Sequence, residues 1–182
     1  MKLPEGDKES RWNALKEIVT GCPTCNANLN PGAQVVFGVG NLDADLFLCG
    51  EAPGAEEEMQ GEPFVGPAGE LLDKILAGAG LSREAVYVGN VMNWRPKHEK
   101  AYGNRPPTIE EMSFCMPYLR AQVEVVRPKV ILALGRTATA ALVEPDPAVK
   151  MGALRGRWWE FEGVPVMPTY HPSYLLHNPS KS

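Results

Sequence analysis

The chain has 182 residues, of which 44% are hydrophobic, and it carries a formal net charge of −4. This length is enough for one hydrophobic core but not for two of ordinary size, so we expect one domain over residues 1–182. No apolar stretch approaches the roughly 20 residues of a membrane span, and the N-terminus is charged where a signal peptide would be apolar. We therefore expect a cytoplasmic protein that neither enters a membrane nor coats nucleic acid through bulk positive charge.

Strand and helix patterns alternate along the chain. In order, the apolar spacing predicts a helix over 11–19, a strand over 46–49, a helix over 69–81, a strand over 86–90, a helix over 108–126, a strand over 130–134, a helix over 136–142, and a hairpin of 158–161 with 164–169. Thr108 and Glu111 have the spacing of a capping box, which sets the start of one helix. This alternation predicts a three-layer α/β/α fold around a central, mostly parallel four-stranded sheet.

Two segments rich in Gly and Pro, residues 50–67 and 93–107, are longer than the roughly 12 residues of an ordinary connector. The first holds five Glu and no basic residue between positions 51 and 62. The second carries four basic residues against one acidic residue, namely Arg95, Lys97, Lys100 and Arg105. We interpret the first as a loop that approaches a ligand closely and the second as a loop that follows a phosphate backbone, with a plain solvated surface as its alternative.

Polar motifs follow two of the predicted strands. Gly50-Glu51-Ala52-Pro53-Gly54 comes directly after residues 46–49, and His171-Pro172-Ser173 follows residues 164–169. Ligands of open α/β sheets bind beyond the carboxyl ends of the strands, so we expect the site there.

Five strings stand out along the sequence: GEAPGAEEEMQGEPFVGPAGELL (50–72), VYVGNV (86–91), PKVILALG (128–135), LRGRWWEFEG (154–163) and HPSYLLHNPS (171–180). Together they closely resemble family 4 uracil-DNA glycosylases. The resemblance runs from about residue 22 to residue 180. It implies an α/β/α enzyme, without a nucleotide cofactor, that removes uracil from DNA by cleaving the N-glycosidic bond. It also implies a four-iron four-sulfur (4Fe-4S) cluster held by four Cys. We expect uracil-containing DNA as the partner and a monomeric protein.

The resemblance also implies a pocket for a flipped base. Phe64 matches the Phe that stacks on uracil, and Asn90 matches the amide that distinguishes uracil from cytosine. A side-chain amide offers both a donor and an acceptor, as the O4 and N3–H edge of uracil requires. The remaining substrate-binding positions implied by the motifs are Gly50, Ala52, Gly54 and Asn104.

Bond cleavage leaves negative charge on the base and positive charge on the sugar, so catalysis should be electrostatic. His171 matches the active-site His that stabilises the developing oxyanion. Glu57 and Glu51 match acidic positions, and we assign Glu57 the larger role, in placing water or stabilising the sugar cation. Ala52 stands where other uracil glycosylases have a water-activating Asp. Arg95, Lys97, Lys100, Arg105 and Ser173 are the predicted DNA contacts.

The cysteines depart from the family pattern. Cys22, Cys25 and Cys115 match three cluster positions, but Trp94 occupies the fourth, and Trp does not ligate iron. His98 is a candidate fourth ligand, since His replaces Cys in some iron–sulfur centres, and a degenerate site without a cluster is the alternative. Cys49 reads as a small buried residue, and a four-Cys zinc site is disfavoured because a second close pair of Cys is absent.

Two other functions remain open at this stage. The longer loop with His98 suggests action on another deaminated base or covalent capture of uracil-DNA. A catalytically silent DNA-binding module is the third reading. The joint presence of Glu51, Glu57, Phe64, Asn90 and His171 argues against that module, which has no need of a complete pocket.

Overall fold

The structure, a computed structural model, describes residues 2–98, 104–144 and 150–172. The elements in chain order are α1 (Lys8–Thr20), α2 (Pro23–Ala27), β1 (Val39–Gly40), β2 (Leu46–Gly50), α3 (Ala55–Gln60), α4 (Gly66–Gly78), the 3-10 helix η1 (Arg83–Ala85), β3 (Tyr87–Asn90), α5 (Ile109–Val126), β4 (Val130–Leu134), α6 (Arg136–Val143), α7 (Met151–Leu154), β5 (Trp159–Phe161) and β6 (Val164–Thr169). Every predicted element is thus found within a few residues of its expected bounds. The structure adds short elements that were not predicted, namely α2, β1, α3, η1 and α7.

One sheet organises these elements, with its strands in the order β1-β3-β2-β4-β6-β5. The four strands β3, β2, β4 and β6 run parallel to one another. The predicted four-stranded sheet corresponds to this parallel set, but the described residues form six strands, because β1 and β5 add antiparallel edges. Parallel strands place their carboxyl ends at one edge, where the predicted polar motifs therefore meet.

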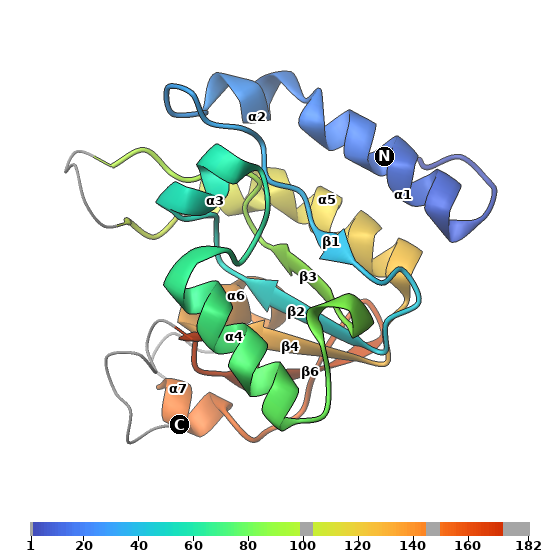
Figure 1. The fold of residues 1–182 in the computed structure, drawn as a ribbon, viewed down its shortest axis with the longest axis vertical. Coiled ribbons are helices and arrows are strands. Elements are labelled where there is room, and N and C mark those ends of the chain that lie inside the picture. Colours follow the sequence, from blue (N-terminus) through green and yellow to red (C-terminus); the bar gives the residue numbers. More distant parts are fainter. Residues whose placement is uncertain (1, 99–103, 145–149, 173–182) are drawn as a thin grey trace.

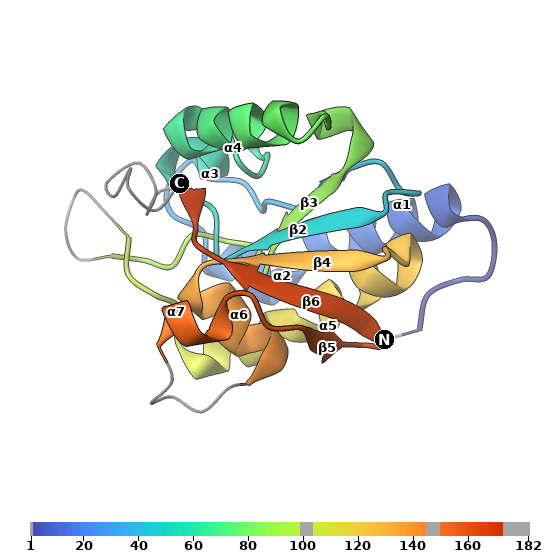
Figure 2. The ribbon, with the colours of Figure 1, turned by 90° about the horizontal axis from the view of Figure 1, so that it is seen from below.

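Helices cover both faces of the sheet (Figures 1 and 2). Helix α4 lies over one face, while α5 and α6 lie over the other and α1 packs along α5. Alternate strand residues serve the two faces: Phe47 and Ile131 belong to the core on the α5 side, and Leu48 and Val88 to the core under α4. This burial on both faces explains why the parallel strands read as continuous apolar runs.

Local signals set the helix boundaries where the sequence provides them. The predicted capping box is confirmed, because Thr108 Oγ1 accepts from the Glu111 backbone N–H at 3.1 Å and the Glu111 carboxylate accepts from the Thr108 N–H at 2.8 Å. The segment 50–67 was expected as a loop and instead contains α3. Three consecutive Glu in the first turn of α3 favour it, since acidic side chains stabilise a helix N-terminus.

In the described part of the chain, none of the helices has both the length and the hydrophobicity of a bilayer span.

Candidate active site

The carboxyl ends of β2 and β3 open into a cavity of about 320 Å³. Its lining residues are Glu51, Ala52, Gly54, Glu57, Phe64, Ala68, Asn90, Asn104 and His171. The structure therefore brings together every predicted catalytic residue and every predicted base-binding residue except Gly50. Ala68 is the one lining residue that the sequence did not indicate.

Gly50 lies next to this cavity and leaves room for its polar lining. A Cβ atom at Gly50 would stand 2.5 Å from Asn90 Oδ1 and 2.7 Å from Phe64 Cζ, closer than real Cβ atoms approach. Gly50 and Asn90 are direct partners in the parallel pairing of β2 with β3. The missing side chain at Gly50 thus creates the space in which the amide and the aromatic ring converge.

Phe64 is held in an unusual backbone conformation with φ 53°, a region that non-glycine residues seldom adopt. Arg83 stabilises this conformation, because its Nη2 donates to the Phe64 carbonyl at 2.6 Å and its Nη1 to the Pro63 carbonyl at 3.3 Å. Arg83 Nε also donates to Asp73 at 2.8 Å. No local sequence pattern indicates this clamp, since Arg83 lies in a separate element, η1, nineteen positions from Phe64.

His171 completes the aromatic side of the cavity. Its ring stacks on Phe64, with ring centroids 5.6 Å apart and an interplanar angle of 29°. Burial lowers the pKa of His171 to about 4, so the imidazole is neutral at physiological pH. A neutral imidazole carries one N–H donor and one acceptor nitrogen, and it presents a dipole rather than a full charge to a ligand.

Asn90 stands at the last position of β3 and is 7% exposed. Beyond it the chain stays tied to the Gly50 loop, because the Val91 N–H donates to the Gly50 carbonyl and the Met92 N–H to the Glu51 carbonyl, both at 2.9 Å. The backbone that carries the Asn90 side-chain amide is therefore held by hydrogen bonds both before and after this residue.

Glu57 supplies the carboxylate in the first turn of α3. Burial raises the pKa of Glu57, repulsion from Glu56 adds to this shift, and hydrogen bonds from the backbone N–H groups of Glu57 and Gly54 partly offset it. A Cβ at Gly54 would meet Glu57 Oε2 at 2.8 Å, so glycine at this position lets the carboxylate lie close to the loop. A carboxylate with a raised pKa in a cavity suits proton transfer.

The basic residues of the second loop have different environments. Arg95 is 15% exposed and pairs with the buried Glu58 at 3.0 Å, whereas Arg105 pairs with Glu111 through two contacts of 2.8 and 3.0 Å. Lys97 is exposed. Lys100 and Ser173 lie outside the described residues. The DNA contacts predicted for this loop stay predictions.

Three buried cysteines, Cys22, Cys25 and Cys115, share one apolar cluster with Trp94, which is 1% exposed. The Trp94 indole N–H has no hydrogen-bond partner among the described residues. Trp94 offers no ligand atom to iron. Within residues 2–98, 104–144 and 150–172, no three or more Cys, His, Asp or Glu side chains are arranged to hold a metal ion.

The described residues therefore do not fit a cluster that needs four thiolates. The role of His98 as a fourth ligand stays a prediction.

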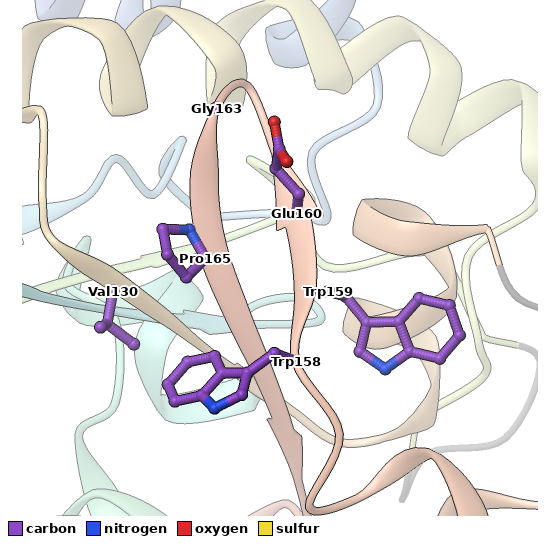
Figure 3. A pocket seen from close by; sticks show the side chains of 6 residues that line it. All are labelled: Val130, Trp158, Trp159, Glu160, Gly163 and Pro165. Carbon is purple, nitrogen blue, oxygen red and sulfur yellow. The ribbon is translucent and has the colours of Figure 1, made fainter.

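A second cavity, of about 370 Å³, lies near the amino ends of β4 and β6 (Figure 3). It is lined by Val130, Trp158, Trp159, Glu160, Gly163 and Pro165. Its carboxylate Glu160 points toward the hairpin turn and away from Trp158 (Figure 3). Polar groups do not converge in this cavity, so the strand-end cavity is the better candidate for catalysis.

Comparison with known proteins agrees with this geometry. A sequence model described as the uracil DNA glycosylase superfamily matches residues 37–182. The chain is 42% identical to the type-4 uracil-DNA glycosylase of Thermotoga maritima over 95% of this chain and 87% of that protein. It is 39% identical to the type-4 uracil-DNA glycosylase of Archaeoglobus fulgidus over 94% of this chain and 85% of that one. It is 41% identical to the type-4 uracil-DNA glycosylase of Saccharolobus solfataricus over 80% of this chain and 68% of that protein.

Proposed function

Because the chain belongs to the uracil DNA glycosylase superfamily, we propose that it removes uracil from DNA and leaves an abasic site. The observation that carries this proposal is the convergence of Phe64, Asn90, His171 and Glu57 in one strand-end cavity. These side chains come from four separate parts of the chain, and together they supply a stacking surface, a base-reading amide, a neutral hydrogen-bond donor and a carboxylate.

The proposed substrate is a uracil nucleotide rotated out of the DNA stack. Phe64 packs on one face of the base. The Asn90 amide donates to O4 and accepts from N3–H. Cytosine presents a donor at position 4 and an acceptor at N3, so one orientation of this amide cannot pair with both bases. Since Asn90 is buried and fixed at the end of β3, a mismatched base leaves its polar atoms unpaired in a desolvated site.

The proposed reaction breaks the bond between N1 of uracil and C1′ of the deoxyribose. The bonding electron pair goes to the base, whose negative charge gathers partly on O2. The neutral His171 imidazole donates a hydrogen bond to that oxygen, and the donor is in place before the charge develops. Because the pKa of His171 is low, the imidazole is uncharged at neutral pH and stabilises O2 through a hydrogen bond rather than through a positive charge.

Water completes the hydrolysis on the sugar side. Its oxygen bonds to C1′ while the Glu57 carboxylate accepts a proton, and the uracil anion later takes up a proton from solvent. The raised pKa of Glu57 makes this carboxylate a better base than an exposed one. We assign Glu51 a supporting role beside the sugar. The monomeric state and the cytoplasmic location expected from the sequence stay predictions.

A denaturing gel with an end-labelled oligonucleotide that contains one uracil tests this function. We expect release of uracil and a strand that breaks on treatment with alkali, and no product from the matched cytosine oligonucleotide. A protein–DNA adduct that survives denaturation would instead indicate covalent capture. Retardation on a native gel without alkali-sensitive product would indicate a silent binding module and contradict the proposal.

A further inference from the structure

Glu58 is a buried carboxylate that takes no direct part in the proposed hydrolysis. It is 1% exposed, although the two preceding residues of α3 are also Glu and Glu57 lines the cavity. A buried charge is costly unless it is paired and hydrogen-bonded. Glu58 Oε2 accepts from Arg95 Nη1 at 3.0 Å, and its Oε1 accepts from Asn30 Nδ2 at 2.9 Å.

Arg95 extends this contact toward the active site. Its Nε donates to Asn104 Oδ1 at 2.8 Å, so one guanidinium joins the buried carboxylate of Glu58 to the amide of Asn104. Asn104 lines the strand-end cavity together with Glu57 and His171. The three residues Glu58, Arg95 and Asn104 thus form a connected path from the protein interior to the cavity.

The chemistry of arginine determines which way the Asn104 amide faces. A guanidinium has only donors, so the atom facing Arg95 is the amide oxygen of Asn104, and the amide nitrogen lies on the other side. This leaves the two N–H donors of Asn104 for the cavity that the residue lines. Without Arg95, the amide has no such constraint and can rotate to present its oxygen.

The backbone near Asn104 is anchored separately. Arg105 Nε donates to the Lys97 carbonyl at 2.6 Å, and its guanidinium pairs with Glu111 at the start of α5. Arg105 therefore fixes the path of the chain, whereas Arg95 contacts the Asn104 side chain itself. The two arginines hold different parts of the same loop.

We propose that Glu58 and Arg95 are positioning residues, which hold Asn104 so that its N–H donors face the nucleotide in the cavity. This inference rests on the proposed uracil-DNA glycosylase function. It gives Arg95 a role other than the phosphate contact expected from the sequence. A side chain that is 15% exposed and already donates to two acceptors is poorly placed to give its charge to DNA.

The test compares Arg95→Lys, Asn104→Ala and the double variant in single-turnover excision at saturating uracil-DNA. Lysine keeps the positive charge, but its compact ammonium does not reproduce the fork that spans both acceptors. We expect each single variant to slow excision by about tenfold, and the double variant to be no slower than Asn104→Ala, because both changes remove the same positioned donor. DNA affinity and its dependence on salt should stay within about twofold of the wild type for Arg95→Lys.

Arg11→Lys is the matched control. Arg11 pairs with Glu124 at 3.3 Å between α1 and α5, outside the lining of the cavity. We expect this variant to excise uracil at the wild-type rate. Losses that multiply in the double variant would overturn the inference, as would an Arg95→Lys variant that loses affinity and salt dependence but cleaves normally at saturation.

A second measurement does not depend on activity. The side-chain amide resonances of Asn104 in a nitrogen–proton correlation spectrum should shift in Arg95→Lys and in Glu58→Gln, and should stay in place in Arg11→Lys. Unshifted resonances in both Glu58→Gln and Arg95→Lys would overturn the path from Glu58 to Asn104. A wild-type protein that leaves uracil in DNA would contradict the proposed function, while the spectrum still reports on this path.

Discussion

Gly50→Ala is the sharpest single perturbation of the candidate site. The added methyl group would stand 2.5 Å from Asn90 Oδ1 and 2.7 Å from Phe64 Cζ, and acceptable contacts begin at 3.0 to 3.4 Å. The amide oxygen must therefore move by about 0.5 to 0.9 Å, which is the difference between these distances. Misplacement of a substrate-positioning group by about 1 Å costs on the order of 100-fold in rate. We expect single-turnover uracil excision to fall by about 30- to 100-fold.

Gly78→Ala provides the matched control for this change. Gly78 is the last residue of α4, and a Cβ there would meet no heavy atom within 4 Å apart from its chain neighbours and the adjacent backbone of its own helix. We expect this variant to excise uracil at the wild-type rate and to unfold at or slightly above the wild-type temperature, since Ala is favoured over Gly in a helix by about 0.5–1 kcal/mol.

Excision by both variants is measured at saturating DNA, and thermal unfolding is recorded in parallel. The atoms nearest to the methyl group of Gly50→Ala are the ends of two side chains, Asn90 and Phe64, and not backbone atoms, so the variant should fold with these side chains displaced and lose activity. Wild-type excision by a folded Gly50→Ala protein would refute the assignment of this cavity to uracil.

Three further predictions address the base edge, the buried imidazole and the basic loop. Asn90→Ala should lower uracil excision by at least about tenfold, because one hydrogen-bond partner lost in a desolvated site costs roughly 1–3 kcal/mol. Unchanged excision by Asn90→Ala would remove this residue from the site. Asn90→Asp should be tested for excision of cytosine. The pKa of His171 is lowered to about 4 in the folded state, so the unfolded state binds more protons between about pH 6.5 and pH 4. The free energy of unfolding should therefore decrease as the pH is lowered through this range. From pH 7 to pH 5 the wild type should lose about 2 kcal/mol of unfolding free energy through His171. In chemical denaturation, His171→Asn should lose about that much less than the wild type over the same pH change. An equal loss in the two proteins would contradict the neutral imidazole. Lys97→Met should weaken DNA binding and lower the slope of log affinity against log salt by about one unit, whereas a constant slope would make this part of the loop a solvated surface.

The parallel sheet and the cavity were predictable from the sequence because local signals specify them. The strands are short apolar runs buried on both faces, and the capping box at Thr108 marks the start of α5. The strand-end motifs follow those runs directly, so the topology of a parallel sheet brings them together without further information. The resemblance to known glycosylases assigned roles to the individual side chains.

The remaining features depend on contacts between distant segments. The two-residue strand β1 carries too little pattern to be recognised, and it exists through its pairing with β3. The resemblance indicated Glu57 as a site residue, but the run of Glu at positions 56–58 gave no sign that the next residue, Glu58, is buried against Arg95. The Arg83 clamp on Phe64 likewise arises only when η1 and the loop before α4 are placed side by side. Sequence spacing identified the residues that meet substrate better than the residues that hold them in place.

The proposed mechanism has this cavity hydrolyse the bond between uracil and DNA by stabilising charge on the departing base. Binding and single-turnover cleavage should therefore be measured on the same uracil-containing oligonucleotide for the wild type and for His171→Ser. We expect the wild type to release uracil, and His171→Ser to cleave about 100-fold more slowly with an affinity within a few-fold of the wild type, because this contact strengthens only as the bond breaks. A His171→Ser variant that binds poorly and cleaves normally once saturated would rule out this role for His171.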